Sequence, residues 1–246
     1  MTRGLAAMDA AAGGKTSVLT DRALRYLLRE IQADDGSIEA RYRFPPINSD
    51  TRHATVAAAM AIRMAPGWFD RLQDPNVRSR MHKLLNYLKS NSPQHDHQRL
   101  QLLWASTFWS DLLAAEDRDR VIRQVWKLQR PDGGWSIRSF ASPAELGGGA
   151  KARELAGEPG FDDPVSDGYL TAFTIVVIRD SGIPAADPRL QKAVSWLKRN
   201  QRESGRWWTK SLNTTSRFHY VSFSGTAYAA LALSKFGELT AADDVE

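Results

Sequence analysis

The feature that most constrains this chain is a helix ending that occurs three times. In each copy a glutamine is followed four residues later by a glycine, and a large apolar residue stands two positions beyond the glycine. The three copies are Gln32, Gly36 and Ile38; Gln129, Gly133 and Trp135; and Gln201, Gly205 and Trp207. A segment that recurs in this way is typical of proteins built from repeated supersecondary units.

Helices of two kinds are expected to alternate along the chain. The clearest amphipathic helix carries Leu190, Ala193, Val194 and Leu197 on one face, at the 3.6-residue period. Amphipathic helices are expected near residues 20–32, 74–90, 118–129 and 187–201, and more apolar ones near 51–64, 98–113, 167–181 and 224–237. The alternation predicts an all-α fold of about four helical hairpins, with the apolar helices inside and the amphipathic ones outside. An α/α toroid, an open arc of one, or part of a larger assembly would each satisfy it.

The expected domain boundaries follow from where the helical pattern begins and ends. Residues 1–17 have a single arginine and no sustained apolar segment, so they indicate a flexible leader and not a signal peptide. The α/α domain is expected over residues 18–238. A flexible tail is expected over residues 239–246.

Composition excludes several classes of function. The chain has no cysteine, so it has no disulfide, thiolate zinc site or cysteine nucleophile. It also has no apolar run of about 18 residues that could span a membrane. The net charge of +5 is spread over the helices without a basic stripe, so nucleic-acid binding is not expected. Weak attraction to an anionic membrane surface is compatible with this charge. We expect a cytoplasmic protein, peripheral to the membrane at most, and the oligomeric state is left open.

The last copy of the helix ending resembles a known repeat. Its residues Lys192, Ala193, Trp196, Leu197, Gln201, Gly205 and Trp207 closely match the QW repeat of squalene-hopene cyclases, oxidosqualene cyclases and related prenyltransferase-repeat proteins. A weaker copy comprises Arg22, Ala23, Tyr26, Gln32 and Gly36, and a third matches at Trp126, Gln129, Gly133 and Trp135. The resemblance implies an α/α toroid and, if the chain is an enzyme, an isomerase or cyclase of the terpenoid type. It also implies that the glutamines bond to backbone at helix ends while the aromatic residues pack over the loops.

The resemblance directs attention to an acidic residue as proton donor. In these cyclases a D-x-D-D motif protonates an alkene, and this chain does not contain that motif. It offers Asp162, Asp163 and Asp167, of which Asp167 begins an inner helix, where the family places its acid. We therefore take Asp167 as the candidate catalytic residue. The alternative is that Asp167 is an ordinary helix N-cap.

Histidines precede or begin several of the inner helices. If those helices run parallel, His53, His95, His97 and His219 gather at one mouth of the fold, together with Asp167. Imidazole and carboxylate groups are standard ligands of zinc and iron, so these histidines predict a metal site and a metal-dependent lyase or hydrolase. Helix N-termini would also favour an anion. The alternative is that the histidines are solvated linker residues.

A second candidate site is formed by aromatic residues of the inner helices. These residues are Trp104, Phe108, Trp109, Tyr169, Phe173 and Tyr228. Aromatic walls bind apolar chains and stabilise cations through their π faces, so the leading functional hypothesis is binding of an apolar isoprenoid-type ligand without conventional squalene cyclase activity. The same residues could instead simply fill the core. A non-catalytic protein-interaction module is the remaining alternative.

Overall fold

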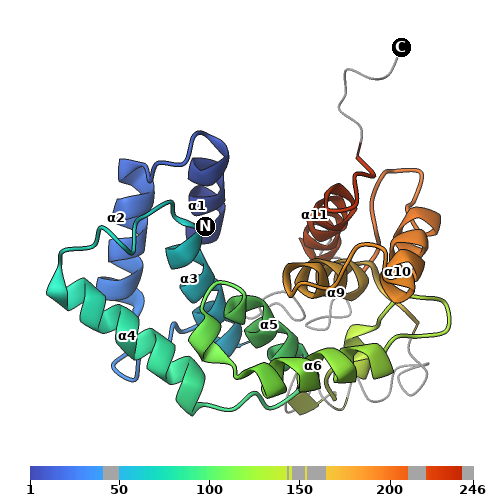
Figure 1. Ribbon diagram of the computed structural model, residues 1–246, viewed down its shortest axis with the longest axis horizontal. Helices are drawn as coiled ribbons and strands as arrows, with labels where there is room; N and C mark the ends of the chain where they lie inside the picture. Colours follow the sequence, from blue (N-terminus) through green and yellow to red (C-terminus); the bar gives the residue numbers. More distant parts are fainter. Residues whose placement is uncertain (41–49, 143, 146–152, 154–164, 210–219, 240–246) are drawn as a thin grey trace. The chain divides into compact units, whose positions relative to one another are not determined.

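The computed structural model describes residues 1–40, 50–142, 144–145, 153, 165–209 and 220–239 (Figure 1). The α-helices are α1 (Thr2–Ala11), α2 (Val18–Tyr26), α3 (Thr51–Met64), α4 (Pro75–Ser90), α5 (Asp96–Ser106), α6 (Ala115–Lys127), α9 (Gly168–Asp180), α10 (Pro188–Arg199) and α11 (Tyr220–Ser234). Short helical turns are η1 (Leu27–Ile31), η2 (Ser110–Leu112) and η3 (Ile137–Ser139). No strand occurs within these ranges. The predicted all-α class is therefore confirmed.

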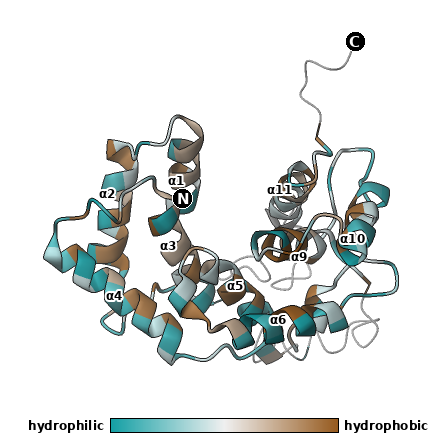
Figure 2. Ribbon diagram, in the orientation of Figure 1, coloured by the Kyte–Doolittle hydropathy of each residue, from teal (hydrophilic) through white to brown (hydrophobic). Residues whose placement is uncertain are grey.

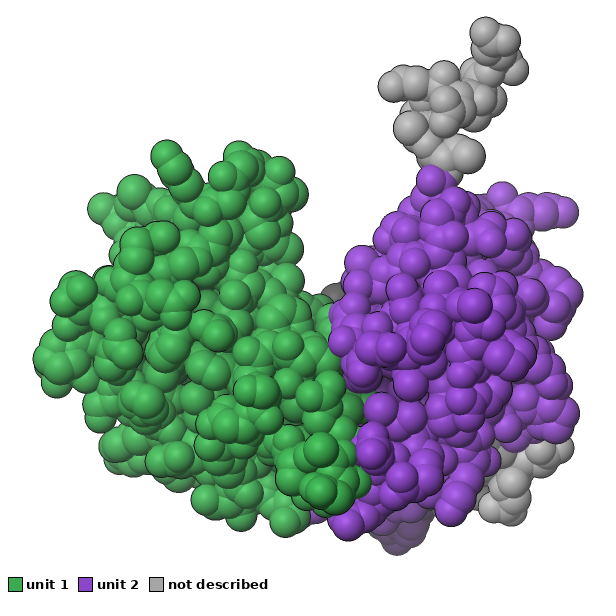
Figure 3. All heavy atoms as spheres, viewed as in Figure 1, with its two compact units in different colours: residues 1–43, 48–93, 101–118 green, residues 44–47, 94–100, 119–246 purple. Residues whose placement is uncertain are grey.

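The chain divides into two compact units, coloured separately in Figure 3. Unit 1 comprises residues 1–43, 48–93 and 101–118, and unit 2 comprises residues 44–47, 94–100 and 119–246. The sequence predicted one domain over residues 18–238. The division could not be read from the sequence because it separates neighbouring residues of α5 and of α6 without a change in composition.

The N-terminal residues differ from the sequence-based expectation. Thr2–Ala11 form helix α1, which packs on α3 and buries Ala6 completely. The connection that follows is also anchored, since Thr16 Oγ1 donates a hydrogen bond to the carbonyl of Pro66 at 2.9 Å. The expectation of a flexible leader was therefore wrong for this segment. Its alanines favour a helix, but its apolar positions are too few to show the packing face. Most of the expected tail, residues 240–246, lies outside the described residues.

The apolar helices, called inner here, and the amphipathic helices, called outer, differ in burial as the pattern predicted for α3, α5 and α9, whereas α11 exposes Phe223 and Leu231. Every residue of α9 from Gly168 to Ile178 is buried, and α3 is buried over most of its length. The outer helices α4 and α10 bury one face only, which Figure 2 shows as brown and teal residues alternating along each ribbon. Both outer helices begin with an aspartate N-cap followed by proline, a favourable helix start.

Helix α2 begins earlier and ends differently than expected. Its N-cap is Ser17, whose Oγ accepts the N–H of Thr20 at 3.2 Å, instead of Thr20 or Asp21. It continues into η1, a single π-helical turn that inserts one extra residue. This insertion explains why Gln32 lies six residues after Tyr26, whereas Gln201 lies five residues after the matching Trp196.

The repeated helix endings share one geometry. We call the segment that follows each outer helix a turn and number the four turns along the chain. The first turn spans residues 32–38, the second 90–95, the third 129–135 and the fourth 201–207. In the first, third and fourth turns the glutamine side chain donates to the carbonyl of the glycine, at 3.0, 2.9 and 3.1 Å. The large apolar residue two positions after the glycine donates its backbone N–H to the hydroxyl oxygen of a threonine in the following inner helix. These residues are Ile38, Trp135 and Trp207. The expected structural role of the glutamines is thus confirmed.

The two tryptophans of these turns donate hydrogen bonds to the C-terminal end of the preceding outer helix. Trp135 is fully buried, and its Nε1–H donates to the carbonyl of Val125 at 2.8 Å. Trp207 is likewise buried and donates to the carbonyl of Leu197 at 2.8 Å. Each indole therefore satisfies a carbonyl near the end of a helix, which would otherwise lack a partner.

The second turn lacks the glutamine–glycine pattern of the other three, and an arginine of α3 pairs with the helix end instead. Arg52, near the start of α3, is buried and donates to the carbonyls of Leu88 and Asn91 at the end of α4. Burial lowers the pKa of this guanidinium from its ordinary value. In the second turn, the last carbonyls of the outer helix therefore pair with Arg52 of the inner helix.

Candidate functional site

Asp167 is the N-cap of α9, and its side chain is buried next to Trp135 of the third turn. One carboxylate oxygen accepts the N–H of Leu170 at 2.8 Å, and the other accepts the N–H of Ile137 at 2.8 Å. Its own N–H donates to the carbonyl of Trp135 at 2.9 Å. Burial raises the pKa of the Asp167 carboxyl to about 6, against the opposing effect of these backbone N–H groups. The N-cap interpretation is confirmed, while a role as proton donor stays a prediction.

Three of the predicted aromatic residues meet in unit 2, where they are joined by a histidine. Tyr169 and Phe173 of α9 stack with ring centroids 5.7 Å apart, and Tyr228 of α11 meets them edge-on at 5.6 and 5.3 Å. His97 of α5 completes the group, 5.9 Å from Tyr169 and 6.0 Å from Phe173. We call these four residues the α9 aromatic cluster.

The polar atoms of this cluster face one another. Nε2 of His97 lies 3.1 Å from the hydroxyl oxygen of Tyr169, and both side chains are buried. The ring of His95 stacks on that of His97 at 6.2 Å, and its Nδ1 accepts the N–H of Gln98 at 3.3 Å. The spacing of His95 and His97 along the chain gave no sign that one of them would join an aromatic cluster.

The other three predicted aromatic residues belong to unit 1. Trp104 lies under the guanidinium of Arg3, 5.1 Å from the ring centroid. Trp109 lies under Arg63 at 5.0 Å, and the carbonyl of Phe108 accepts the Nε–H of the same arginine at 3.4 Å. Arginine cations therefore cover the indoles of Trp104 and Trp109, whereas the cluster in unit 2 is made of aromatic rings and imidazole.

His53 also lies in unit 1, where it contacts a glutamine. Its Nδ1 is 2.6 Å from Nε2 of Gln101. Burial lowers the pKa of His53 to about 4, and nearby Asp50 opposes this shift. The imidazole is therefore neutral at pH 7, and a neutral ring nitrogen can accept the amide hydrogen bond.

The predicted histidine mouth is only partly described. His53 belongs to unit 1 and His95 and His97 to unit 2, while His219 lies outside the described residues, as do Asp162 and Asp163. Within the part of the chain that the structure describes, no group of three or more histidine, aspartate or glutamate side chains is placed to hold a metal ion. The zinc or iron site stays a prediction from the sequence.

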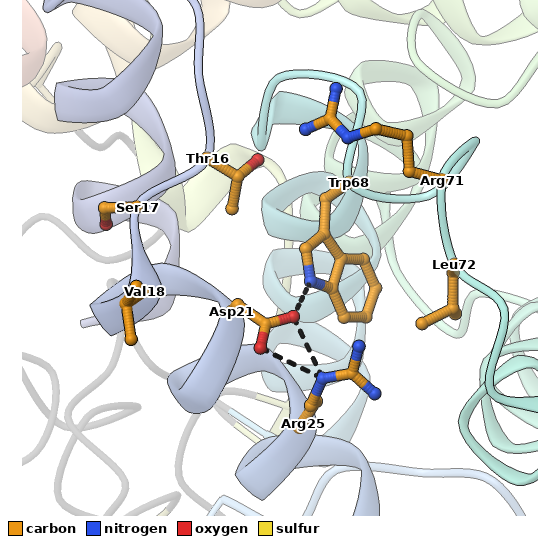
Figure 4. A pocket seen from close by; sticks show the side chains of 8 residues that line it. All are labelled: Thr16, Ser17, Val18, Asp21, Arg25, Trp68, Arg71 and Leu72. Carbon is orange, nitrogen blue, oxygen red and sulfur yellow. Dashed lines mark hydrogen bonds and ion pairs between the residues drawn. The ribbon is translucent and has the colours of Figure 1, made fainter.

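A pocket of about 270 Å³ opens in unit 1, between α2 and the residues that follow α3 (Figure 4). Its lining residues are Thr16, Ser17, Val18, Asp21, Arg25, Trp68, Arg71 and Leu72. Asp21 joins two of the walls, since it accepts the Nε1–H of Trp68 at 2.7 Å and pairs with Arg25 at 2.9 Å. The sequence did not predict this pocket because its residues come from two segments separated by α3.

Comparisons with known proteins leave the family open. Neither a scan of protein-family models nor a search of curated proteins found a match to this chain. Among the described helices, none combines the length and the apolar character needed to cross a membrane.

Proposed function

We propose that this chain binds an apolar isoprenoid-type ligand against the α9 aromatic cluster, in an α/α toroid-like fold related to the squalene cyclase and prenyltransferase repeat proteins. The observation that carries the proposal is the convergence of His97, Tyr169, Phe173 and Tyr228 from three helices. Clustered aromatic faces give a large, polarisable contact surface for an unsaturated hydrocarbon chain.

The arrangement of polar atoms supports an apolar ligand. The hydroxyl of Tyr169 and Nε2 of His97 lie 3.1 Å apart, so these two polar atoms pair with each other inside the buried part of the cluster. Tyr228 is only partly buried, unlike Tyr169 and Phe173, so it is the member of the cluster that a ligand would meet first. The proposal is therefore one of binding beside Tyr228.

The proposal does not include protonation by Asp167. Its raised pKa suits a proton donor, and it begins the helix that carries Tyr169 and Phe173. Both carboxylate oxygens, however, accept backbone N–H groups. Protonation would remove one of these acceptors, so proton donation would compete with capping of α9.

Calorimetric titration with farnesol tests the proposal. We expect wild-type protein to bind farnesol more tightly than a saturated alcohol of similar length. Tyr228→Leu should raise the Kd for farnesol about five- to tenfold, because it removes an aromatic face but keeps apolar volume. The matched control is Phe108→Leu, which changes a partly buried aromatic residue of unit 1 and should leave the Kd unchanged.

Two outcomes would overturn the proposal. One is the absence of any heat of binding to wild-type protein. The other is an equal loss of affinity in Tyr228→Leu and Phe108→Leu, which would place the ligand elsewhere. Retention of the native circular-dichroism spectrum in both variants ensures that the comparison concerns binding and not unfolding.

A further inference from the structure

In two of the repeats, the next outer helix packs directly on the turn that precedes it. The glutamine of the first turn donates to the carbonyl of Arg80 in α4 at 2.9 Å, and the glutamine of the third turn donates to the carbonyl of Arg189 in α10 at 2.9 Å. A turn glutamine thus holds two carbonyls, one in its own turn and one in the neighbouring outer helix.

The glycine of each of these turns provides the space for that helix. A Cβ on Gly36 would lie 2.3 Å from the carbonyl oxygen of Lys83, and one on Gly133 would lie 2.7 Å from that of Lys192. These helix residues occupy corresponding positions, because each stands three residues after the carbonyl that the glutamine holds. The close approach of backbone to backbone requires glycine.

An aromatic residue of the outer helix completes the contact. In α10, Trp196 is buried and donates from Nε1 to Asp132 of the third turn at 2.9 Å. The corresponding residue of α4 is Tyr87, whose pKa is raised by burial and by Asp35 of the first turn. We call this set of three positions the docking edge of an outer helix: Arg80, Lys83 and Tyr87 in α4, and Arg189, Lys192 and Trp196 in α10.

The fourth turn has the same geometry but no helix packed on it among the described residues. Gln201 donates to the carbonyl of Gly205, and no second acceptor occurs within the described part of the chain. A Cβ on Gly205 would meet only Nε2 of Gln201, 4.0 Å away, among the described atoms. Next to this turn, Trp208 is 46% exposed. Among the described residues, the receiving half of the repeat contact is therefore present without an outer helix packed on it.

Helix α2 has the other part of the contact, a docking edge with no turn packed on it among the described residues. The match of Tyr26 to Trp196 places its docking edge at Leu19, Arg22 and Tyr26. All three are exposed, Leu19 at 62% and Tyr26 at 60%, whereas Trp196 is 6% exposed in α10. Helix α2 and η1 are joined to the start of α4, since Arg25 and Arg29 pair with Asp74. The docking edge of α2 thus exposes two large apolar side chains, with Arg22 between them.

We propose that the fourth turn of one copy of this chain binds the docking edge of α2 of a second copy, so that the chains associate head to tail. The two surfaces are the open halves of a contact that the chain makes twice internally, in the first and third turns. In the complex, Gln201 donates its second amide hydrogen to the carbonyl of Leu19, the backbone near Arg22 lies over Gly205, and Tyr26 covers the turn. This contact joins two different surfaces, so a dimer still has one free fourth turn and one free docking edge of α2. Association therefore continues beyond a dimer unless a ring closes.

Complementation between two single variants tests this arrangement. Tyr26→Glu charges the docking edge, and Gln201→Glu replaces the amide donor with a carboxylate that repels both carbonyls. Both positions are exposed, so neither change disturbs the core. Leu231→Ser, at a residue of α11 that is 40% exposed and belongs to neither surface, is the matched control.

The readout is sedimentation velocity from about 1 to about 500 μM protein. Wild type and Leu231→Ser should associate as concentration rises, and each glutamate variant alone should associate at least about tenfold more weakly. An equimolar mixture of the two glutamate variants should form a dimer and nothing larger, because each copy supplies one intact surface. Three results would overturn the proposal: a wild-type protein that stays monomeric, association that persists in Tyr26→Glu, or a mixture that stays monomeric.

Discussion

The third and fourth turns share a sequence pattern but have different surroundings. In the third turn, Gln129 holds a carbonyl of helix α10 and Gly133 lies against the backbone of Lys192. In the fourth turn, Gln201 bonds only within its own turn, and Gly205 has open space around it among the described residues. A repeated motif therefore does not imply a repeated energetic role, because the contribution of each copy depends on what packs against it.

The largest expected difference concerns the two glycines. Both have positive φ, 99° at Gly133 and 76° at Gly205, so alanine is strained at either position. Gly133→Ala should also force α10 away and lower the free energy of unfolding by about 3 kcal/mol or more. Gly205→Ala should cost about 1 kcal/mol. Urea denaturation measures both values, and equal losses would show that the close approach of Lys192 is unimportant.

Titration of Asp167 tests the inner side of the third turn. Its carboxyl has a pKa of about 6 in the folded protein and near 3.8 when exposed, so the native state binds the proton more readily between these values. Stability should therefore rise as pH falls from about 6 towards 4, by on the order of 1 kcal/mol at pH 5 relative to pH 7.5. The measurement is the difference between wild type and Asp167→Asn in urea midpoints across this range. A difference that does not vary with pH would contradict it.

His53 in unit 1 supplies a control of opposite sign. Its pKa is about 4 in the folded protein and near 6.5 when exposed, so the unfolded state binds the proton more readily. Stability should fall as pH drops from about 6.5 towards 4, and the loss is of the same order, 1 to 2 kcal/mol at pH 5. His53→Gln should remove this dependence while leaving the Asp167 response intact. Loss of both responses in one variant would show that the two titrations are coupled.

The smallest expected effect concerns the two glutamines. Gln129→Ala removes two side-chain hydrogen bonds and should cost about 1.5 kcal/mol, whereas Gln201→Ala removes one exposed bond and should cost about 0.5 kcal/mol. Thermal unfolding at low protein concentration measures the difference. At high concentration the cost of Gln201→Ala should increase, because association would then stabilise wild type but not the variant. A cost that is independent of concentration would count against head-to-tail association.

The sequence predicted the helices well because their signals are local. The apolar face of α10 and the aspartate and proline at its start lie within one turn or two of each other. The site was harder to predict. From the sequence, Tyr169, Phe173 and Tyr228 were expected to line one site with three aromatic residues that lie in unit 1, and His97 was expected to bind a metal. In the structure, His97 lies against Tyr169, 72 residues away, a pairing that no local pattern contains.

The sequence by itself determined the all-α class and the alternation of apolar and amphipathic helices, and its resemblance to the QW repeat predicted that the turn glutamines bond to backbone, because these features depend on residues a few positions apart. Only the tertiary structure decided that α1 packs on α3, that Ile137 donates to the Asp167 carboxylate, and that α10 fills the third turn. The physical reason is that burial and backbone approach depend on which distant segment lies alongside. Gly133 and Gly205 are the same residue in the same motif, and only the presence of Lys192 beside one of them distinguishes the two.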